Sequence, residues 1–468
     1  MAAAAHRFRT ALASGPLAVR GFRLLLAGQL SSTVGDYCYA VALPWLILSG
    51  DGGPVLLGTV LACYGIPRVV TISLGGVVAD RFGGRRVMLV ADVVRAAAVG
   101  YLAIVAFTGT PTLAQLAPVA VVLGASSGVF IPSSYTLLPA LLPKDDLGRG
   151  NALSTMVNQV GGLLGPTAGG ALVAGFGAGP ALTVDAVSFV VSAAVLFRMR
   201  TGADAEPAGT TAPDTPGGTA GTAEAGDPKG PSFARLLREG RLLHVVLVVA
   251  LVCNLAFNGT IEVALPELAH QGMGATGYGV LLTCLSLGGL AGSLIAARAR
   301  TVTSPAYLFA ALAVVMGAAL AAVPYAGGLV GAAVCVCLYA AASGWQNIVA
   351  VTMLQVWTPP ALIGRAMSLV MLAVMGTFPV SVAVAGFGVR HLGAAPFFPA
   401  AGAAIALAVL CALSQKAFRG YRSGDEFTPA ATKATTDVTT DRTAVRSHRD
   451  ERVRSAGKAG TPPRTGHR

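Results

Sequence analysis

The segment DYCYAVALPWLI (residues 36–47) shares its central VALP with NGTIEVALPELA (residues 258–269), far along the chain. Aligning the two VALP tetrapeptides places Asn258 opposite Asp36. The same segment in two distant places predicts a chain built from two related halves. The exchange of Asp for Asn predicts that the halves differ chemically at this position.

Two further matches support the duplication. SSGVFIPSSYTLLPALLPKDDLGR ends at Arg149, and ASGWQNIVAVTMLQVWTPPALIGR, which shares Ser, Gly, Thr, Leu, Pro, Gly and Arg at equivalent places, ends at Arg365. The tetrapeptide AGFG occurs at 174–177 and again at 385–388. The three matches follow the same order in both copies, so the first six apolar segments are expected to repeat as the last six.

The composition is that of a membrane protein. Hydrophobic residues make up 54% of the 468, and only 12% are charged, against about 25% in soluble domains. Runs of about 20 apolar residues, enough to cross a bilayer as a helix, recur at 22–48, 55–79, 87–107, 112–138, 151–175, 178–198, 242–266, 277–298, 305–325, 328–353, 365–389 and 396–416. The predicted fold class is an all-α membrane protein with twelve transmembrane helices in two six-helix repeats.

Composition also predicts the segment boundaries. The two six-helix halves are expected at 22–200 and 241–418, between a cytoplasmic N-terminal segment (1–21) and a disordered cytoplasmic tail (419–468). The linker, 201–240, lacks large apolar side chains over its first thirty residues and is expected to be disordered there. Its end, SFARLLREGRLL, predicts a short basic amphipathic helix on the anionic inner leaflet.

The positive charges predict the orientation. The net charge is +12, and nearly all of the 33 Lys and Arg residues lie in the tails, the linker and alternate loops. Arg68 and Arg95 lie inside spans, and Arg390 is the one expected in an external loop. By the positive-inside rule, both termini face the cytoplasm of a multi-pass plasma (inner) membrane protein. The excess of basic over acidic residues therefore reflects the membrane topology, and nucleic acid is not an expected partner.

Several other classes of function are not indicated. The seven Cys residues lie within predicted spans, and Cys335 and Cys337 point to different sides of a helix, so neither a metal site nor a disulfide framework is expected. No G-x-x-x-x-G-K-[ST] motif is present. We expect no cofactor, no enzymatic activity and a monomeric protein.

The loop after the second apolar run carries a family motif. GGVVADRFGGRR (75–86) resembles the loop signature of the major facilitator superfamily. The resemblance implies a cytoplasmic latch between the halves, in which Asp80 pairs with arginines or a helix N-terminus. Gly84 departs from the signature, because the family usually has a basic residue there. The latch candidates are Gly76, Asp80, Arg81, Gly83, Arg85 and Arg86.

The fifth apolar run contains GGLLGPTAGG (161–170), which resembles the antiporter signature of the same superfamily. Its residues Gly161, Gly165 and Gly169 recur every four positions, a stripe against which another helix can pack closely. Pro166 bends the helix, and Gly170 completes the motif. The resemblance implies export rather than uptake.

Three weaker stretches, GDYCYAVALPW (35–45), VADVVRA (90–96) and VDAVSFVVSAAV (184–195), resemble the bacterial branch that contains macrolide-efflux proteins and the enterobactin exporter. The resemblance covers roughly residues 20–418 and implies the major facilitator fold. Many drug–proton antiporters of the family have an Arg in the fourth span, and VVLGASSGVFIPSSY (121–135) has none.

Charges inside the spans are costly and therefore indicate function. Asp36 and Arg68 lie near the midplane of consecutive spans, where they either form a fixed pair or face one water-filled cavity. Asp92, Arg95 and Asp185 lie nearer the ends of their spans, and a structural role is expected for them.

The seventh span places Asn254, Asn258 and Glu262 on one helical face. Asp36 and Glu262 are the proton-coupling candidates, one carboxyl from each half. Spans 1, 4, 7 and 10 line the central cavity in the superfamily, so the resemblance implies a substrate cavity lined by the polar residues of these four spans. Arg68 of span 2 is a further candidate. The candidates are Gln29, Ser32, Arg68, Tyr135, Asn254, Asn258, Trp345, Gln346 and Asn347.

The expected function is secondary active export of a small, partly apolar compound, such as a drug, an antibiotic or a secondary metabolite. Alternating access and proton antiport are the expected mechanism, with the substrate, protons and the lipid bilayer as partners. The alternatives are a siderophore- or metabolite-specific exporter, a proton-coupled importer on the same fold, and a membrane sensor that does not transport.

Overall fold

The computed structural model describes residues 15–50, 52–199, 233–299 and 304–422, and the elements in these ranges are helical. The predictions for most of the N-terminal segment, the first part of the linker and most of the tail therefore lie outside the described residues. Within the second part of the linker, α8 (Phe233–Glu239) occupies the place of the predicted short helix.

The first half of the chain forms six long helices. They are α2 (Arg20–Leu48), α3 (Gly53–Phe82), α4 (Gly84–Thr108), α5 (Leu113–Leu141), α6 (Leu147–Phe176) and α7 (Ala178–Arg198). The turns between α3 and α4 and between α6 and α7 are single glycines, Gly83 with φ 82° and Gly177 with φ 83°. This left-handed conformation ends a helix at little cost only for glycine.

The second half starts with α8 and continues through a helix interrupted by a π turn, labelled η4. Its elements are α9 (Arg241–Gly259), η4 (Thr260–Ala264), α10 (Leu265–Gly272), α11 (Gly274–Arg298), α12 (Pro305–Ala322), α13 (Leu329–Trp357), α14 (Ile363–Leu392), α15 (Phe397–Ser414) and the short α16 (Lys416–Arg419). The segment α9–η4–α10 counts as one span.

Ten helices in the described ranges are long and apolar enough to cross a membrane, which confirms the predicted class of all-α membrane protein. The two long helices outside this set are α2 and α6, of 29 and 30 residues. Both carry polar side chains inside the bundle, among them Asp36 and Asn158. The count of twelve spans therefore stays a prediction for these two helices.

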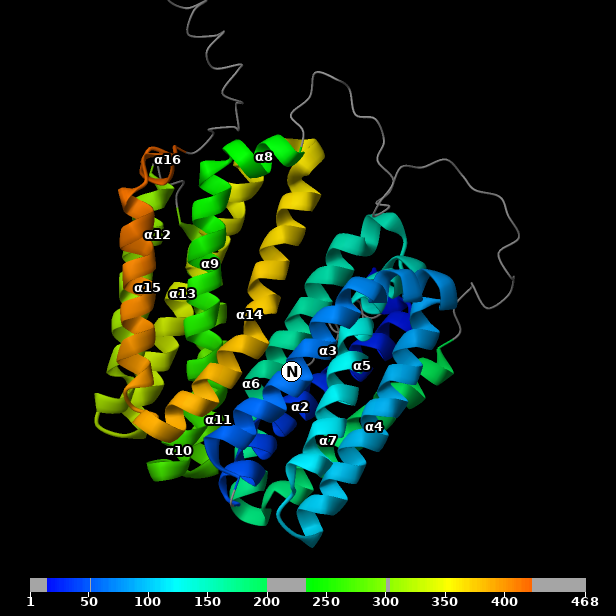
Figure 1. Cartoon of the computed structure of the whole chain (residues 1–468). Helices are drawn as coiled ribbons and strands as arrows, with labels where there is room; N and C mark the ends of the chain where they lie inside the picture. The colour runs from blue at the N-terminus through cyan, green and yellow to red at the C-terminus, as the bar shows by residue number, and fades with distance from the viewer. Residues whose placement is uncertain (1–14, 51, 200–232, 300–303, 423–468) are drawn as a thin grey trace, which may run out of the picture.

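The two halves meet along α3 and α14 and along α6 and α11 (Figure 1). A Cβ at Gly58 of α3 would lie 3.0 Å from the Cα of Gly386 of α14, and the hydroxyls of Thr167 and Thr283 lie 2.7 Å apart. We call the end of the bundle where α7 ends and α8 begins the linker end. These contacts all lie toward the opposite end, as their positions within the helices show.

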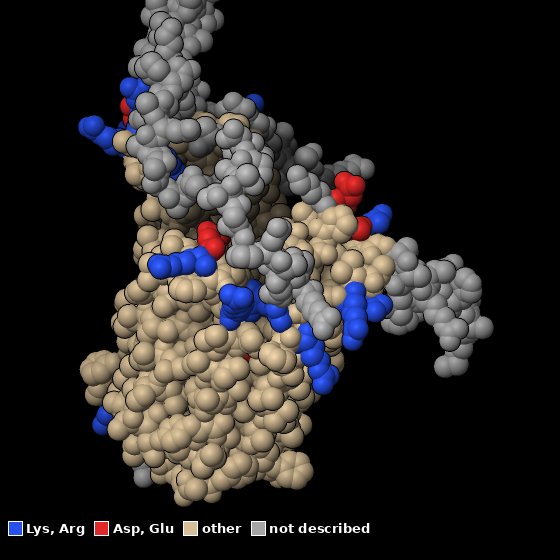
Figure 2. All heavy atoms as spheres, turned by 90° about the vertical axis from the view of Figure 1, so that its right-hand side faces the viewer, with Lys and Arg blue, Asp and Glu red and all other residues tan. Residues whose placement is uncertain are grey.

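The surface separates into an apolar belt and a charged end. Large apolar side chains such as Ile66, Val77 and Phe387 are more than half exposed along the helices, as expected of groups that face lipid tails. Figure 2 shows Lys and Arg gathered on the upper part of the visible face, whereas the lower part is mostly uncharged.

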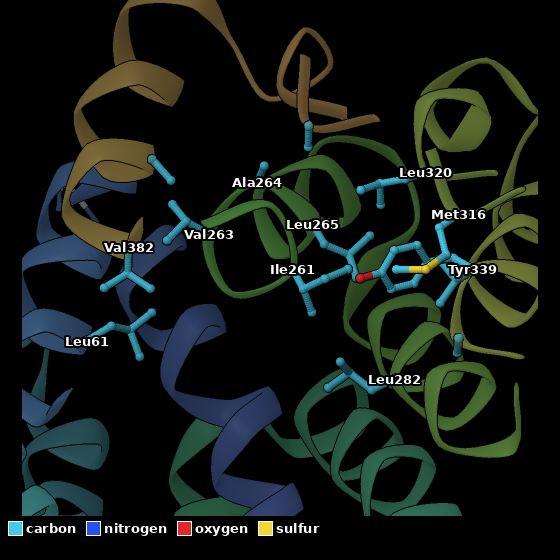
Figure 3. Packing of buried hydrophobic residues seen from close by; sticks show 14 of the residues in the cluster. Leu61, Ile261, Val263, Ala264, Leu265, Leu282, Met316, Leu320, Tyr339 and Val382 are labelled. Atoms are coloured by element: carbon cyan, nitrogen blue, oxygen red, sulfur yellow. The ribbon is translucent and has the colours of Figure 1, made fainter. Parts of the chain in front are cut away.

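The π turn is fixed by apolar packing on two sides. Ile261 and Leu265 point toward Tyr339 and Met316 inside the second half, and Val263 points toward Val382 of α14 (Figure 3). Ile261, Val263 and Leu265 are each at most 2% exposed. Glu262, between them in the chain, is half-buried and lines a cavity. A π turn inserts an extra residue into a helix and is frequent at functional sites.

Candidate functional site

A cavity of about 530 Å³ lies inside the bundle, within the range of small-molecule sites. Most of its wall comes from α2 to α7, and Glu262 and Phe378 contribute from the second half. The lining extends from Leu25, close to the linker end, to Pro44, near the far end of α2. Beyond it, the contacts between the halves and the edge-to-face pair of Trp45 and His270, with ring centroids 4.8 Å apart, close the bundle.

Asp36 faces this cavity as an exposed side chain although it lies in the middle of α2. Two cations act on it electrostatically, Arg95 of α4 and Arg68 of α3. No ion pair within 4.0 Å joins Asp36 and Arg68, both of which are described. Of the two arrangements predicted, the structure shows the shared cavity and not the fixed pair.

Glu262, which lies in the π turn η4, lines the same cavity from the second half. Arg68 acts electrostatically on Glu262 as well as on Asp36. A single guanidinium thus lies within electrostatic reach of one carboxyl from each half.

The structure brings part of the predicted polar set into the cavity. Gln29, Ser32, Asp36, Arg68, Tyr135 and Glu262 line it, and Asn254, Asn258, Trp345, Gln346 and Asn347 do not. The amide of Asn254 donates to the carbonyl of Ala250, 2.8 Å away on its own helix. Gln346 is buried and donates to the carbonyl of Phe309 at 3.1 Å, because α13 packs against α11 and α12 and turns this face away from the cavity.

Two residues for which a purely structural role is expected from sequence also line the cavity, Arg95 and Asp185. The guanidinium of Arg95 lies 4.4 Å from the ring centre of Phe130 and 5.4 Å from that of Phe189. The distance of a charged residue from the ends of its span therefore does not predict whether it lines the cavity. The signal that could have identified them is the charge itself, since buried ionisable groups in spans mark functional sites.

Asp92 lies behind this wall as a buried carboxyl group with one hydrogen-bonded oxygen. Its Oδ2 accepts a hydrogen bond of 2.6 Å from Ser192 of α7, and its Oδ1 is 3.6 Å from Nη1 of Arg95. The side chain is fully buried. Asp92 therefore holds Arg95 in place and ties α4 to α7, the structural role predicted for it.

Gly35 allows α7 to approach α2 next to Asp36. A Cβ there would collide with the hydroxyl of Ser188 and lie 2.6 Å from Oδ1 of Asp185. We expect Gly35→Ala to lower the stability of the protein by about 1–3 kcal/mol through overpacking, a cost that exceeds the gain of roughly 1 kcal/mol in helix propensity.

Thermal unfolding of the detergent-solubilised protein tests this expectation. Gly100→Ala in α4 is the matched control, because a Cβ at Gly100 meets nothing within 4 Å. Equal unfolding temperatures for Gly35→Ala and the wild type would contradict the close approach.

The glycines of the GGLLGPTAGG segment lie on two faces of α6, and each face packs closely against another helix. Added Cβ atoms at Gly161, Gly165 and Gly169 would lie 2.6–2.8 Å from Thr33, Tyr37 and Cys38 of α2. Gly170 faces the second half instead, where a Cβ would lie 2.8 Å from the carbonyl of Ala275. The carbonyl of Pro166 faces Gly279 on the same side. The motif therefore packs α6 tightly on its own half and on the other.

The loop motif GGVVADRFGGRR lies at the linker end. Asp80, Arg81, Gly83 and Arg86 are exposed, and a Cβ at Gly76 would meet nothing within 4 Å. Arg85 donates from Nε and Nη2 to the carbonyls of Leu196 and Phe197 at 2.8 and 2.9 Å, which caps the end of α7.

Gly84, the departure from the family motif, packs against α5. A Cβ there would collide with the hydroxyl of Thr136 and lie 2.7 Å from the carbonyl of Ser133. The structure thus leaves no room for the basic side chain that is usual at this position.

Comparison with known proteins agrees with this architecture. The sequence profile of the Major Facilitator Superfamily matches residues 25–339. The uncharacterized MFS-type transporter YfiS of Bacillus subtilis is 26% identical over 322 residues, 66% of this chain and 71% of its own length. The multidrug efflux pump Tap of Mycobacterium tuberculosis is 27% identical over 277 residues, 58% of this chain. The matched part spans 64% of Tap, less than two thirds of that relative.

Among solved structures, a peptide transporter POT in complex with sulfate is similar with a TM-score of 0.66 and 14% identity, over 86% of this chain and 95% of that one. At this identity the likeness shows the fold alone. The profile match extends over more than half of the residues. The chain therefore belongs to the Major Facilitator Superfamily and is a membrane transporter.

Proposed function

We propose that this transporter exports a small, partly apolar compound, such as a drug, an antibiotic or a secondary metabolite, as a proton antiporter. The observation that carries the proposal is the composition of the cavity. Asp36 and Glu262, one carboxyl from each half, line the cavity together with Arg68, which acts electrostatically on both. Apolar and aromatic side chains such as Val60 and Phe189 form much of the remaining wall.

The positive charges support an orientation with the linker end in the cytoplasm. In that orientation the described conformation faces inward, because the halves touch toward the external end. Alternating access then requires the contacts of α3 with α14 and of α6 with α11 to open and the linker end to close. The exposed motif residues Asp80 and Arg81 lie where a cytoplasmic latch would act.

Protons and the substrate compete for the carboxyl groups inside the cavity, and this competition couples proton movement to transport. In an outward-facing form, protons from outside neutralise Asp36 and Glu262 and weaken the hold on the substrate. In the inward-facing form, the carboxyls release these protons and the substrate binds again. The GPxxGG spacing within the GGLLGPTAGG segment and the relationship to Tap support export, and Tap is a multidrug efflux pump by its name.

Accumulation of a panel of dyes and antibiotics in a pump-deficient bacterial host tests the proposal. Cells that make the protein are compared with cells that carry an empty vector, with and without a protonophore. We expect lower accumulation in the presence of the protein and loss of the difference when the protonophore collapses the gradient.

Three other results would each replace the proposal. If no compound is excluded although the protein reaches the membrane, a narrow substrate such as a metabolite or siderophore replaces broad efflux. Uptake into vesicles together with inward protons would identify an importer. A complete absence of gradient-dependent flux, insensitive to substitution of Asp36 and Glu262, would identify a sensor.

A further inference from the structure

Asp185 of α7 is a buried carboxyl without an ion-pair partner among the described residues. Its side chain is 1% exposed, and it lines the inner wall of the cavity. The hydrogen bond that its carboxyl accepts from Ser188 is long, 3.5 Å. A carboxylate this deeply buried needs a cation or strong hydrogen-bond donors, and otherwise it takes up a proton.

Asp92 provides the contrast in the same half of the protein. It is equally buried, but it has Ser192 at 2.6 Å and Arg95 at 3.6 Å. Two carboxyls on neighbouring helices thus have different surroundings: a cation lies within 4.0 Å of Asp92, and none of the described cations lies within 4.0 Å of Asp185.

Asp185 is also placed next to Asp36. Its Oδ1 lies against the backbone of Gly35, where an added Cβ would be 2.6 Å away. The charged groups that face Asp185 are Asp36 from α2 and Arg95 from α4, and Asp92 lies behind Arg95. Two further titratable side chains of α2, Cys38 and Tyr39, also face Asp185. With Arg68 near Asp36 and Glu262, four carboxyls share two guanidiniums, so the set holds more carboxyls than counter-charges.

We propose that Asp185 is a further proton-binding residue of the transporter and shares one proton with Asp36. In the described conformation the proton is on a carboxyl oxygen of Asp185. When it moves to a carboxylate oxygen of Asp36, Asp185 becomes the anion, Arg95 balances it, and Asp36 passes the proton to water in the cavity. That this proton drives transport rests on the function proposed above, but its binding at Asp185 does not.

Infrared spectroscopy of the purified protein in lipid tests the binding. The carbonyl stretch of a protonated carboxylic acid is separate from that of a carboxylate, and its shift in heavy water identifies it. At neutral pH we expect Asp185→Asn to lose one such band and Asp92→Asn, the matched control, to keep it. Retention of every band in Asp185→Asn would overturn the proposal.

Thermal unfolding supplies a second, independent measurement. Asp185→Asn replaces a neutral group by a neutral group of the same shape, so the unfolding temperature should stay near that of the wild type. Asp92→Asn removes the carboxylate that lies 3.6 Å from Arg95 and should lower the unfolding temperature clearly. The reverse order would show that Asp185 is the charged partner and would overturn the proposal.

Transport assays separate this proposal from the proposed function. We expect Asp185→Asn to lose proton-driven accumulation and Asp185→Glu to restore part of it. Wild-type proton-driven transport by Asp185→Asn would overturn the coupling role. If the wild-type protein moves no compound while the band is lost in Asp185→Asn, the export function fails and the proton site stands.

Discussion

Asp36→Asn and Glu262→Gln should each reduce proton-driven export by at least about a hundredfold, the scale of losing a positioned proton-transfer group. Both carboxyls face the cavity, and Arg68 acts on both. The amides keep nearly the same shape but cannot exchange a proton. We therefore expect both variants to fold, to bind substrate and to exchange it at equilibrium, while a pH gradient no longer drives net movement.

Everted membrane vesicles with an imposed pH gradient measure this effect directly. Glu267→Gln is the matched control for Glu262→Gln, because Glu267 lies on the adjoining α10, outside the cavity, and accepts a hydrogen bond from Gln271. Asp145→Asn, an exposed carboxyl in the loop before α6, is the control for Asp36→Asn. If either cavity variant transports at the rate of its control, that carboxyl does not couple protons to transport.

Gly170→Val should displace the protein from the described conformation. A Cβ at Gly170 would lie 2.8 Å from the carbonyl of Ala275 and 3.2 Å from the Cα of Gly279, both on α11 of the other half. Overpacking of such a contact costs about 1–3 kcal/mol, which corresponds to a shift of roughly 5- to 150-fold between conformations. Because only the contact between halves is affected, each half should remain folded.

Hydrogen exchange of the backbone amides in the first turns of α11 reports the opening of this end. We expect faster exchange and slower transport in Gly170→Val. Gly175→Val on the same helix is the matched control, since a Cβ at Gly175 meets nothing within 4 Å. Equal exchange in the two variants would show that the contact of Gly170 with α11 does not hold the halves together.

The sequence by itself determined the helices and the family. The predicted spans 22–48, 178–198 and 305–325 correspond closely to α2, α7 and α12 with the short helix η5 (Val323–Tyr325) that follows it. This agreement has a simple reason: in a bilayer the length of an apolar run sets the length of the helix, independently of its neighbours. The motifs GGVVADRFGGRR and GGLLGPTAGG are likewise local and could be identified without coordinates.

Only the tertiary structure decided which polar residues share the cavity. Helical periodicity predicts Asn254, Asn258 and Glu262 on one face, but a π turn interrupts the helix at Thr260, and of the three only Glu262 lines the cavity. Gln346 is likewise predicted to face the cavity, but its side chain donates a hydrogen bond to the carbonyl of Phe309 on α12. A periodic pattern states which residues share a face of a helix and leaves open which neighbour that face meets.

The same limit applies to the charges of the first half. Asp185 and Arg95 lie far from Asp36 in the sequence, and the approach of Asp185 to α2 depends on the missing side chain at Gly35, which lets α7 pack closely against α2. Such a contact is a property of two helices and not of either one. Helix positions could be predicted because bilayer insertion depends on each segment separately, whereas the site required the structure because its chemistry depends on how the helices pack together.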